Sequence, residues 1–511
     1  MPKNSINNKR IAKNTLFLYL RMIVVMAVNL YVVRAVLDLL GVVDYGIYNV
    51  VGGVVHMFSF INSTLATSSQ RYFSIELAKG DLKSLNKWFC LNVTTFFIFI
   101  IVFLIIAETI GLWFVNTQMT IPEERMFAAN IVYQLSIITF CIHFFNIPYT
   151  AMIIAYERMS AFAYISILEA ILKLGIVFLL MVISWDKLIL YALLMFLISC
   201  GITSSYIIYN LNFFKASKYH FYWNKEEMKE LLSFSGWHFY GTFSVVIRSQ
   251  GINILLNLFF NPAINAARAI AYQIYAAVNQ LSHNFFVAVK PQIYKSYAKR
   301  EFNELYRLIT RSTIMCSFLV SILIFPLLAN TNFVLSLWLK EVPDYAIIFT
   351  KLVLINGLID ATNGPTTASI LATGKIKIYE LTVANMTIAI LPISYIALKL
   401  GAEPTVTMIV SILISIVVTI TRAVFLNKMI KFPLKMYFFT IGKIFVVTIF
   451  TLIFIKMTFL YSSTNLISFI GNSFLIFVLL IFIYIFIILD TSDKHFLKTI
   501  ITRYYHDRIR T

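Results

Sequence analysis

Three arginines lie inside apolar stretches of the sequence: Arg21, Arg248 and Arg268. A charge at the centre of a bilayer costs roughly 2.5–3.5 kcal/mol on insertion scales, so each of these side chains needs a partner or a wet cavity. A guanidinium stays charged and can bind two phosphate oxygens through parallel hydrogen bonds. These residues therefore predict either a cationic, water-filled cavity that binds an anion, or ion pairs that hold helices together.

Polar side chains recur at three- to four-residue spacing on two apolar stretches, one of which also contains Arg268. One set includes Asn49, His56 and Ser63, and the other follows Arg268 with Tyr272, Tyr275 and Asn279. This spacing puts each set on one face of a helix, and such a face cannot contact lipid without a penalty. We expect both stripes to line the cavity together with the arginines.

Acidic residues inside the apolar stretches are scarcer than basic ones, and Glu169 and Asp360 are the clear examples. Glu169 and Lys173 are four residues apart, so we expect them to pair on one helix face. Asp360 precedes a Gly-Pro pair that predicts a helix break. Two interpretations of Asp360 stay open: it binds a proton or Na⁺ that is coupled to transport, or it is the counter-ion of Arg248 or Arg268.

No set of residues indicates catalysis. The sequence has no Gly-rich nucleotide loop, no identifiable Ser–His–Asp arrangement and no His/Asp/Glu set at metal-ligand spacing. The four cysteines are not at metal or redox spacing. We therefore predict a protein that is not an enzyme, with no catalytic residue, no metal and no cofactor.

The composition places these residues in a membrane. Of the 511 residues, 60% are hydrophobic and 13% are charged, against about 25% charged in soluble domains. The apolar residues fall in blocks of about 18–25, the length that crosses a bilayer core. The net charge of +19 comes from bases clustered between these blocks, which is typical of loop charge that sets membrane orientation and not of nucleic-acid binding.

We predict an all-α, multi-pass protein with about fourteen transmembrane helices. They are expected near 12–34, 46–70, 88–110, 126–150, 161–184, 187–210, 233–258, 263–289, 312–330, 346–372, 377–400, 404–426, 437–459 and 466–490. With both termini in the cytoplasm, about 29 of the 42 Lys and Arg fall on the cytoplasmic side and about 6 outside. The N-terminal stretch resembles a signal peptide but lacks a cleavage site, so we interpret it as the first helix.

An internal repeat divides the chain. The segment 78–85 aligns with 298–305 at an offset of 220 residues, and Gly41 then falls on Asn261. Because each repeat holds an even number of helices, both have one orientation. We predict a six-helix lobe at 1–215, a second at 216–430, two additional helices at 431–490 and a basic cytoplasmic tail at 491–511.

The first 90 residues resemble the opening of polysaccharide-biosynthesis flippases. The likeness is carried by the segments 14–21, 34–37, 40–49 and 70–71 and by the basic loop at 79–81. These flippases belong to the multidrug/oligosaccharidyl-lipid/polysaccharide (MOP) exporter superfamily. The hydropathy and repeat pattern extend the resemblance to the whole chain.

The resemblance implies two six-helix lobes in a V like that of multidrug and toxic compound extrusion (MATE) transporters, followed by two helices. It implies a flippase that moves undecaprenyl-pyrophosphate-linked oligosaccharide outward by alternating access, for O-antigen, lipopolysaccharide or capsule assembly. The expected location is the bacterial inner membrane, with the lipid bilayer and other polysaccharide-assembly proteins as partners. Flippases of this family have arginines in the cavity, a role that Arg21, Arg248 and Arg268 would fill.

Other functions fit parts of the sequence. A cation-coupled multidrug exporter of the same fold would have twelve helices and an acidic cavity. A membrane polysaccharide polymerase or glycosyltransferase would need a sizeable outside loop, whereas the longest one here, near 331–345, is short. A two-lobe sugar permease is a further alternative. None of these explains the arginines and the additional helices as well as the flippase does.

Overall fold

The structure is a computed structural model that describes residues 3–56, 59–119, 121–339, 341–457 and 465–488, without the side chains of 3–9, 42, 53–56, 59 and 60. These residues form seventeen α-helices and no strand, so the predicted all-α class is confirmed. The predicted tail at 491–511 and the side chain of His56 lie outside this description. By contact, the chain divides into two compact units.

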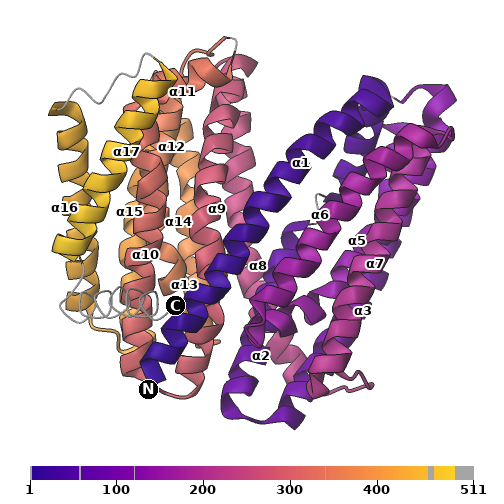
Figure 1. Ribbon diagram of the computed structural model, residues 1–511, viewed down its shortest axis with the longest axis horizontal. Helices are drawn as coiled ribbons and strands as arrows, with labels where there is room; N and C mark the ends of the chain where they lie inside the picture. The colour runs from indigo at the N-terminus through magenta and orange to yellow at the C-terminus, as the bar shows by residue number, and fades with distance from the viewer. Residues whose placement is uncertain (1–2, 57–58, 120, 340, 458–464, 489–511) are drawn as a thin grey trace, which may run out of the picture. The chain divides into compact units, whose positions relative to one another are not determined.

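Unit 1 consists of residues 1–243, 287–301 and 374–377. Its helices are α1 (Lys3–His56), α2 (Ser59–Lys79), α3 (Leu82–Ile106), α4 (Leu112–Thr117), α5 (Met126–Ala155), α6 (Met159–Val182) and α7 (Lys187–Phe213). Figure 1 shows α5, α6 and α7 running alongside one another. Aromatic side chains fill the contact between α3 and α5, where Phe103 lies 4.4 Å from Phe140 and Phe96 lies 5.1 Å from Phe144, ring centroid to ring centroid.

Gly41 interrupts α1 with a φ of 79° and a ψ of 168°. Residues with a Cβ rarely adopt this conformation, so glycine allows the chain to leave one helical segment and begin the next. The predicted first two spans therefore meet at this break.

Unit 2 consists of residues 244–286, 302–373 and 378–511. Its own helices are α10 (Phe302–Ala329), α11 (Thr331–Trp338), α12 (Ala346–Asp360), α13 (Asn363–Ala372), α14 (Lys377–Lys399), α15 (Val406–Ile430), α16 (Leu434–Met457) and α17 (Leu466–Ile483). The last two pack on α10, where Ile476 and Leu480 are buried in one apolar cluster with Ile324.

Two long helices contribute to both units. They are α8 (Lys225–Phe259) and α9 (Pro262–Ala298). Residues of α8 up to Phe243 belong to unit 1 and the rest to unit 2, whereas α9 passes from unit 2 to unit 1 after Phe286. Each is longer than a bilayer requires, at 35 and 37 residues.

Ten helices in the described part of the chain are long and apolar enough to cross a membrane. The pair α12 and α13, bent by 42°, makes an eleventh. The count of fourteen is therefore not confirmed. The difference has a physical reason, because α2 and α9 carry polar side chains of the two predicted stripes and α8 carries Arg248, and these side chains lower the mean hydropathy of the three helices.

The aligned loops of the internal repeat end their helices in the same way. Gly80 has a φ of 79° and Arg300, at the matching position, has a φ of 57°. Both residues thus adopt the left-handed conformation that commonly ends a helix. Asp81 then caps α3 by accepting hydrogen bonds from the backbone N–H groups of Lys83 and Ser84.

Candidate functional site

Arg21 lies on α1 and contacts α6 in unit 1. Its guanidinium stands over the ring of Phe162, 4.6 Å from the centroid, and the carboxylate of Glu169 is the nearest opposite charge acting on it. Glu169 is already paired, because Lys173 Nζ donates to it at 2.7 Å. The predicted Glu169–Lys173 pair is therefore confirmed, and Arg21 keeps a positive charge that no direct ion pair neutralises.

Polar side chains of α2 make hydrogen bonds within unit 1. Thr64 and Thr242 of α8 share a hydrogen bond of 3.0 Å, and Ser235 of α8 donates to Ser68 at 2.9 Å. Lys290 of α9 donates to Thr67 at 3.1 Å. The stripe residues predicted nearer the start of the span differ: Asn49 is exposed and donates to the Tyr45 carbonyl, and Ser63 is exposed.

Arg268 lies on α9 in unit 2 and is 4% exposed. It donates from Nη1 to Asn253 Oδ1 of α8, and its guanidinium stands 4.6 Å from the ring centroid of Tyr272. Both partners are uncharged, so they hold the guanidinium in place and leave its charge uncompensated. Asn279, also predicted in this stripe, is partly buried further along α9.

Asp360 ends α12 at the predicted helix break. Tyr275 of α9 donates to its carboxylate at 3.3 Å and Asn356 donates at 3.0 Å. The positive charges that act on it are those of Arg248 and Arg422. Two guanidinium groups that act on Asp360 oppose the binding of a further cation there, and both interpretations of Asp360 stay predictions.

Arg248 lies on α8, and its charge acts on both Asp360 and Arg268. Within the described residues, Arg21, Arg248 and Arg268 form no ion pair with a carboxylate at 4.0 Å or less. The structure thus places two of the three predicted arginines together in unit 2 and the third in unit 1. Their role in binding a phosphate stays a prediction.

Arg422 of α15 is a functional candidate that the sequence analysis missed. It donates from Nε to the hydroxyl of Tyr379 at 3.2 Å and acts on Asp360. Ser415 and Thr419 precede it on α15 at helical spacing, and a charged residue inside an apolar span is itself a signal. The same argument that selected Arg248 could have found it.

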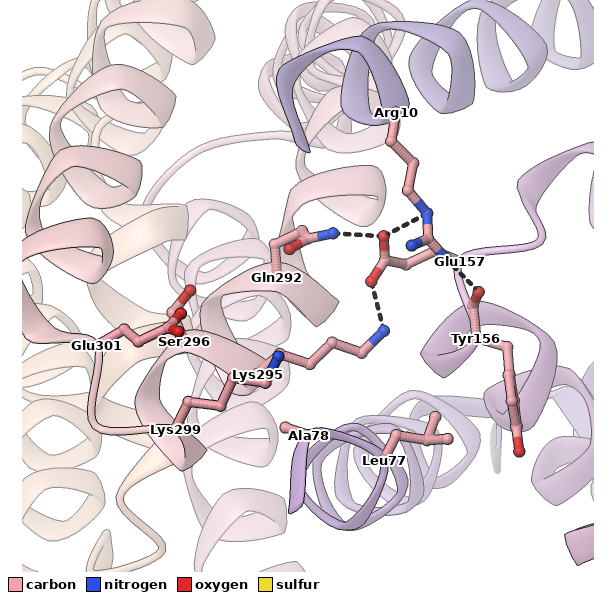
Figure 2. A pocket seen from close by; sticks show the side chains of 10 residues that line it. All are labelled: Arg10, Leu77, Ala78, Tyr156, Glu157, Gln292, Lys295, Ser296, Lys299 and Glu301. Atoms are coloured by element: carbon pink, nitrogen blue, oxygen red, sulfur yellow. Dashed lines mark hydrogen bonds and ion pairs between the residues drawn. The ribbon is translucent and has the colours of Figure 1, made fainter. Parts of the chain in front are cut away.

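A second missed feature is a polar cavity of about 260 Å³ in unit 1 (Figure 2). Its charged and amide side chains are Arg10, Glu157, Gln292, Lys295, Lys299 and Glu301. Glu157, in the turn between α5 and α6, is 4% exposed and points into the centre of this group. No sequence signal marked it, because a lone acid in a short loop is usually solvated.

Arg125 joins three segments at the predicted outer end of unit 1. It pairs with Asp44 of α1 and with Asp186 at 2.5 Å each. Asp186 also caps α7 by accepting hydrogen bonds from Leu188 N and Ile189 N. The hydrogen bonds from Arg125 lower the pKa of the Asp186 carboxyl. Asp44 is thus a structural residue of the segment 40–49 that carries the family resemblance.

The fold is that of MATE transporters of the MOP superfamily. The structure of a mutant of the Vibrio cholerae MATE transporter VcmN matches with a TM-score of 0.71 at 14% identity, over 86% of this chain and 100% of that one. An outward-facing multidrug resistance MATE transporter of the MOP superfamily matches with a TM-score of 0.69 at 14% identity, over 83% and 96% of the two chains. No family model and no curated protein matches the sequence.

A third similar structure is a MOP superfamily transporter from Pyrococcus furiosus, with a TM-score of 0.65 at 14% identity over 83% and 97% of the chains. The reverse polarity of that protein's binding pocket suggests a different function for it. At such identities the likeness establishes the MATE-like fold of this chain.

Proposed function

We propose that this chain is a flippase that moves an undecaprenyl-pyrophosphate-linked oligosaccharide from the cytoplasmic to the outer leaflet by alternating access. It would act in the inner membrane of a bacterium, with both termini in the cytoplasm, during assembly of a surface polysaccharide. The observation that carries the proposal is Arg268, a buried arginine whose contacting partners are both uncharged, on a MATE-like fold.

Unit 2 holds the charges that favour an anionic substrate. Arg248 and Arg422 act on Asp360, Arg248 also acts on Arg268, and Arg268 has only uncharged partners. Buried charges of one sign are costly unless an opposite charge joins them. A pyrophosphate supplies that charge, and arginine binds phosphate oxygens in pairs. The isoprenoid tail of such a substrate can stay in lipid while the head crosses in a polar cavity.

A cation-coupled multidrug exporter is the second candidate, because one of the similar structures is a multidrug resistance MATE transporter. That function needs an anionic or neutral site for cationic drugs. The arginines of unit 2 oppose it by charge repulsion, whereas Asp360 is the one feature that favours it.

Reconstitution into liposomes separates the two functions. The liposomes would contain undecaprenyl-pyrophosphate carrying a labelled oligosaccharide, and an impermeant glycosidase would report the labelled head that reaches the opposite leaflet. We expect Arg268→Gln to slow this transfer by at least about tenfold, because one charged hydrogen-bonding partner of phosphate is worth roughly 1.5–3 kcal/mol.

The matched control is Arg307→Gln, which removes the same charge from an exposed position on α10 and should leave the transfer rate unchanged. Export of a cationic dye would be measured in the same liposomes. Dye export without oligosaccharide transfer, unaffected by Arg268→Gln, would reject the flippase in favour of the multidrug exporter.

A further inference from the structure

Glu157 connects three segments that are far apart in the sequence (Figure 2). Its carboxylate accepts a hydrogen bond from Arg10 Nε of α1 at 3.0 Å, one from Gln292 Nε2 of α9 at 2.5 Å, and one from Lys295 Nζ of α9. Arg10 also donates to the carbonyl of Tyr156 at 2.9 Å. The side chain of Glu157 is 1% exposed, whereas that of Arg10 is 47% exposed and that of Lys295 17%, so solvent screens the pair with Lys295 less than the pair with Arg10.

The backbone holds this carboxylate in a single direction. Glu157 has a φ of 60°, a left-handed conformation that is uncommon for a residue with a Cβ. It forms the tight turn between α5 and α6, where its N–H donates to the Ile154 carbonyl at 2.9 Å. A residue held in a costly conformation is one that the surrounding structure requires there.

The partner helix α9 has a weak point close to Glu157. Pro291 lies inside α9 and has no N–H, so the carbonyl of Val287 lacks its helical hydrogen bond. The boundary between the units on α9 falls between Phe286 and Val287. Gln292 and Lys295 lie on the unit 1 side of this point, and Arg268 and Tyr275 lie on the unit 2 side. Helices bend most readily at such a proline.

We infer that Glu157 is a positioning residue of the transport cycle: it fixes the end of α9 to unit 1, and its release lets α9 change direction at Pro291. This inference rests on the transport function proposed above, whatever the substrate. Arg268 and Tyr275 lie on the part of α9 that precedes Pro291. The state of the Glu157 hydrogen bonds therefore determines the direction of the helix segment that carries these two residues. We call this set of Arg10, Glu157, Gln292 and Lys295 the α9 latch.

The latch must hold one state of the cycle and yet be able to open. Removing one partner of a buried ion pair leaves an uncompensated charge. In Glu157→Gln the charges of Arg10 and Lys295 remain without their anion, and the state with the latch closed is therefore penalised. A state in which Lys295 reaches water avoids this penalty, so the population should shift toward it.

Spin labels on the two units would measure this shift. In a full-length chain with its four cysteines replaced, the labels would be placed at Lys187→Cys in unit 1 and Glu403→Cys in unit 2, both exposed. Pulsed electron paramagnetic resonance gives the distribution of distances between them. We expect Glu157→Gln to raise the ratio of the minor to the major distance population by about tenfold.

Glu301→Gln is the control, since it removes one negative charge from the same cavity and leaves the carboxylate of Glu157 in place. Lys295→Gln should shift the distance distribution in the same direction as Glu157→Gln. If Glu157→Gln does not fold, Lys295→Gln tests the role of the α9 latch in its place. Distributions for both latch variants that coincide with that of Glu301→Gln would overturn the inference. Transport of a drug in place of an oligosaccharide would overturn the proposed function but would not contradict the inference about the α9 latch.

Discussion

Gly357 of α12 gives the ring of Tyr275 the space to reach Asp360. A Cβ at this position would lie 2.6 Å from Tyr275 Cε2 and 3.0 Å from Cδ2. Ordinary contact begins near 3.4 Å, so the ring would have to move by roughly 0.8 Å. The hydroxyl of Tyr275 is already 3.3 Å from the carboxylate of Asp360, and this hydrogen bond cannot follow such a shift.

We expect Gly357→Ala to lower the free energy of unfolding by about 1–3 kcal/mol. Overpacking costs about 1–3 kcal/mol and the lost hydrogen bond about 1 kcal/mol, while alanine returns up to about 1 kcal/mol of helix propensity. The measurement is thermal unfolding of the purified protein in detergent, followed by intrinsic fluorescence. Gly175→Ala on α6 is the control, because a Cβ there meets no atom within 4 Å.

A second substitution tests the cause of the loss. Tyr275→Leu removes the ring that meets the new Cβ, so the double variant with Gly357→Ala should be more stable than the sum of the two single effects predicts. Contacting residues deviate from additivity in this way by about 0.5–3 kcal/mol. If Gly357→Ala is as stable as Gly175→Ala, or if the two effects simply add, the packing argument is wrong.

Three further outcomes follow from the contacts described above. The pairing with Arg125 lowers the pKa of Asp186 in the folded protein. It therefore stabilises the fold above the unfolded pKa of about 3.9, and this stability is lost as the pH falls through the folded pKa. Between about pH 6 and pH 3, the thermal unfolding midpoint should fall less steeply with pH in Arg125→Gln than in the unmodified protein. Asn86→Ala should destabilise the protein by about 1–3 kcal/mol in a thermal unfolding experiment, because Asn86 Nδ2 satisfies the carbonyls of Ala216 and Lys218 at 2.8 Å each. If Asp360 is a counter-ion, Asp360→Asn should leave the dependence of transport on Na⁺ and pH unchanged in liposomes, whereas a lost dependence would support the ion-coupling interpretation.

The structure assigns a physical role to two residues of the segment that carries the family resemblance. The sequence marked Gly41 and Asp44 within the segment 40–49, and the structure gives each a physical task. Gly41 breaks α1 with a positive φ, and Asp44 pairs with Arg125. The first task could be predicted from the residue type alone. The second could not, because the partner lies 81 residues away.

The sequence by itself determined the all-helical class, the membrane setting and the choice of buried charges. These follow from composition and from helical spacing, which are local properties of the chain. It also predicted the Glu169–Lys173 pair, since residues four apart on a helix must be neighbours.

Only the tertiary structure decided which charges from different helices meet. It placed Arg248 and Arg422 around Asp360, left Arg268 with the uncharged Asn253 and Tyr272, and buried Glu157 under Arg10 and Lys295. These contacts join helices far apart in the sequence, and their geometry depends on how the helices pack. The tertiary structure also shows where polar side chains of α2 find partners on α8 and α9, and a helix that packs on other helices need not be apolar all round.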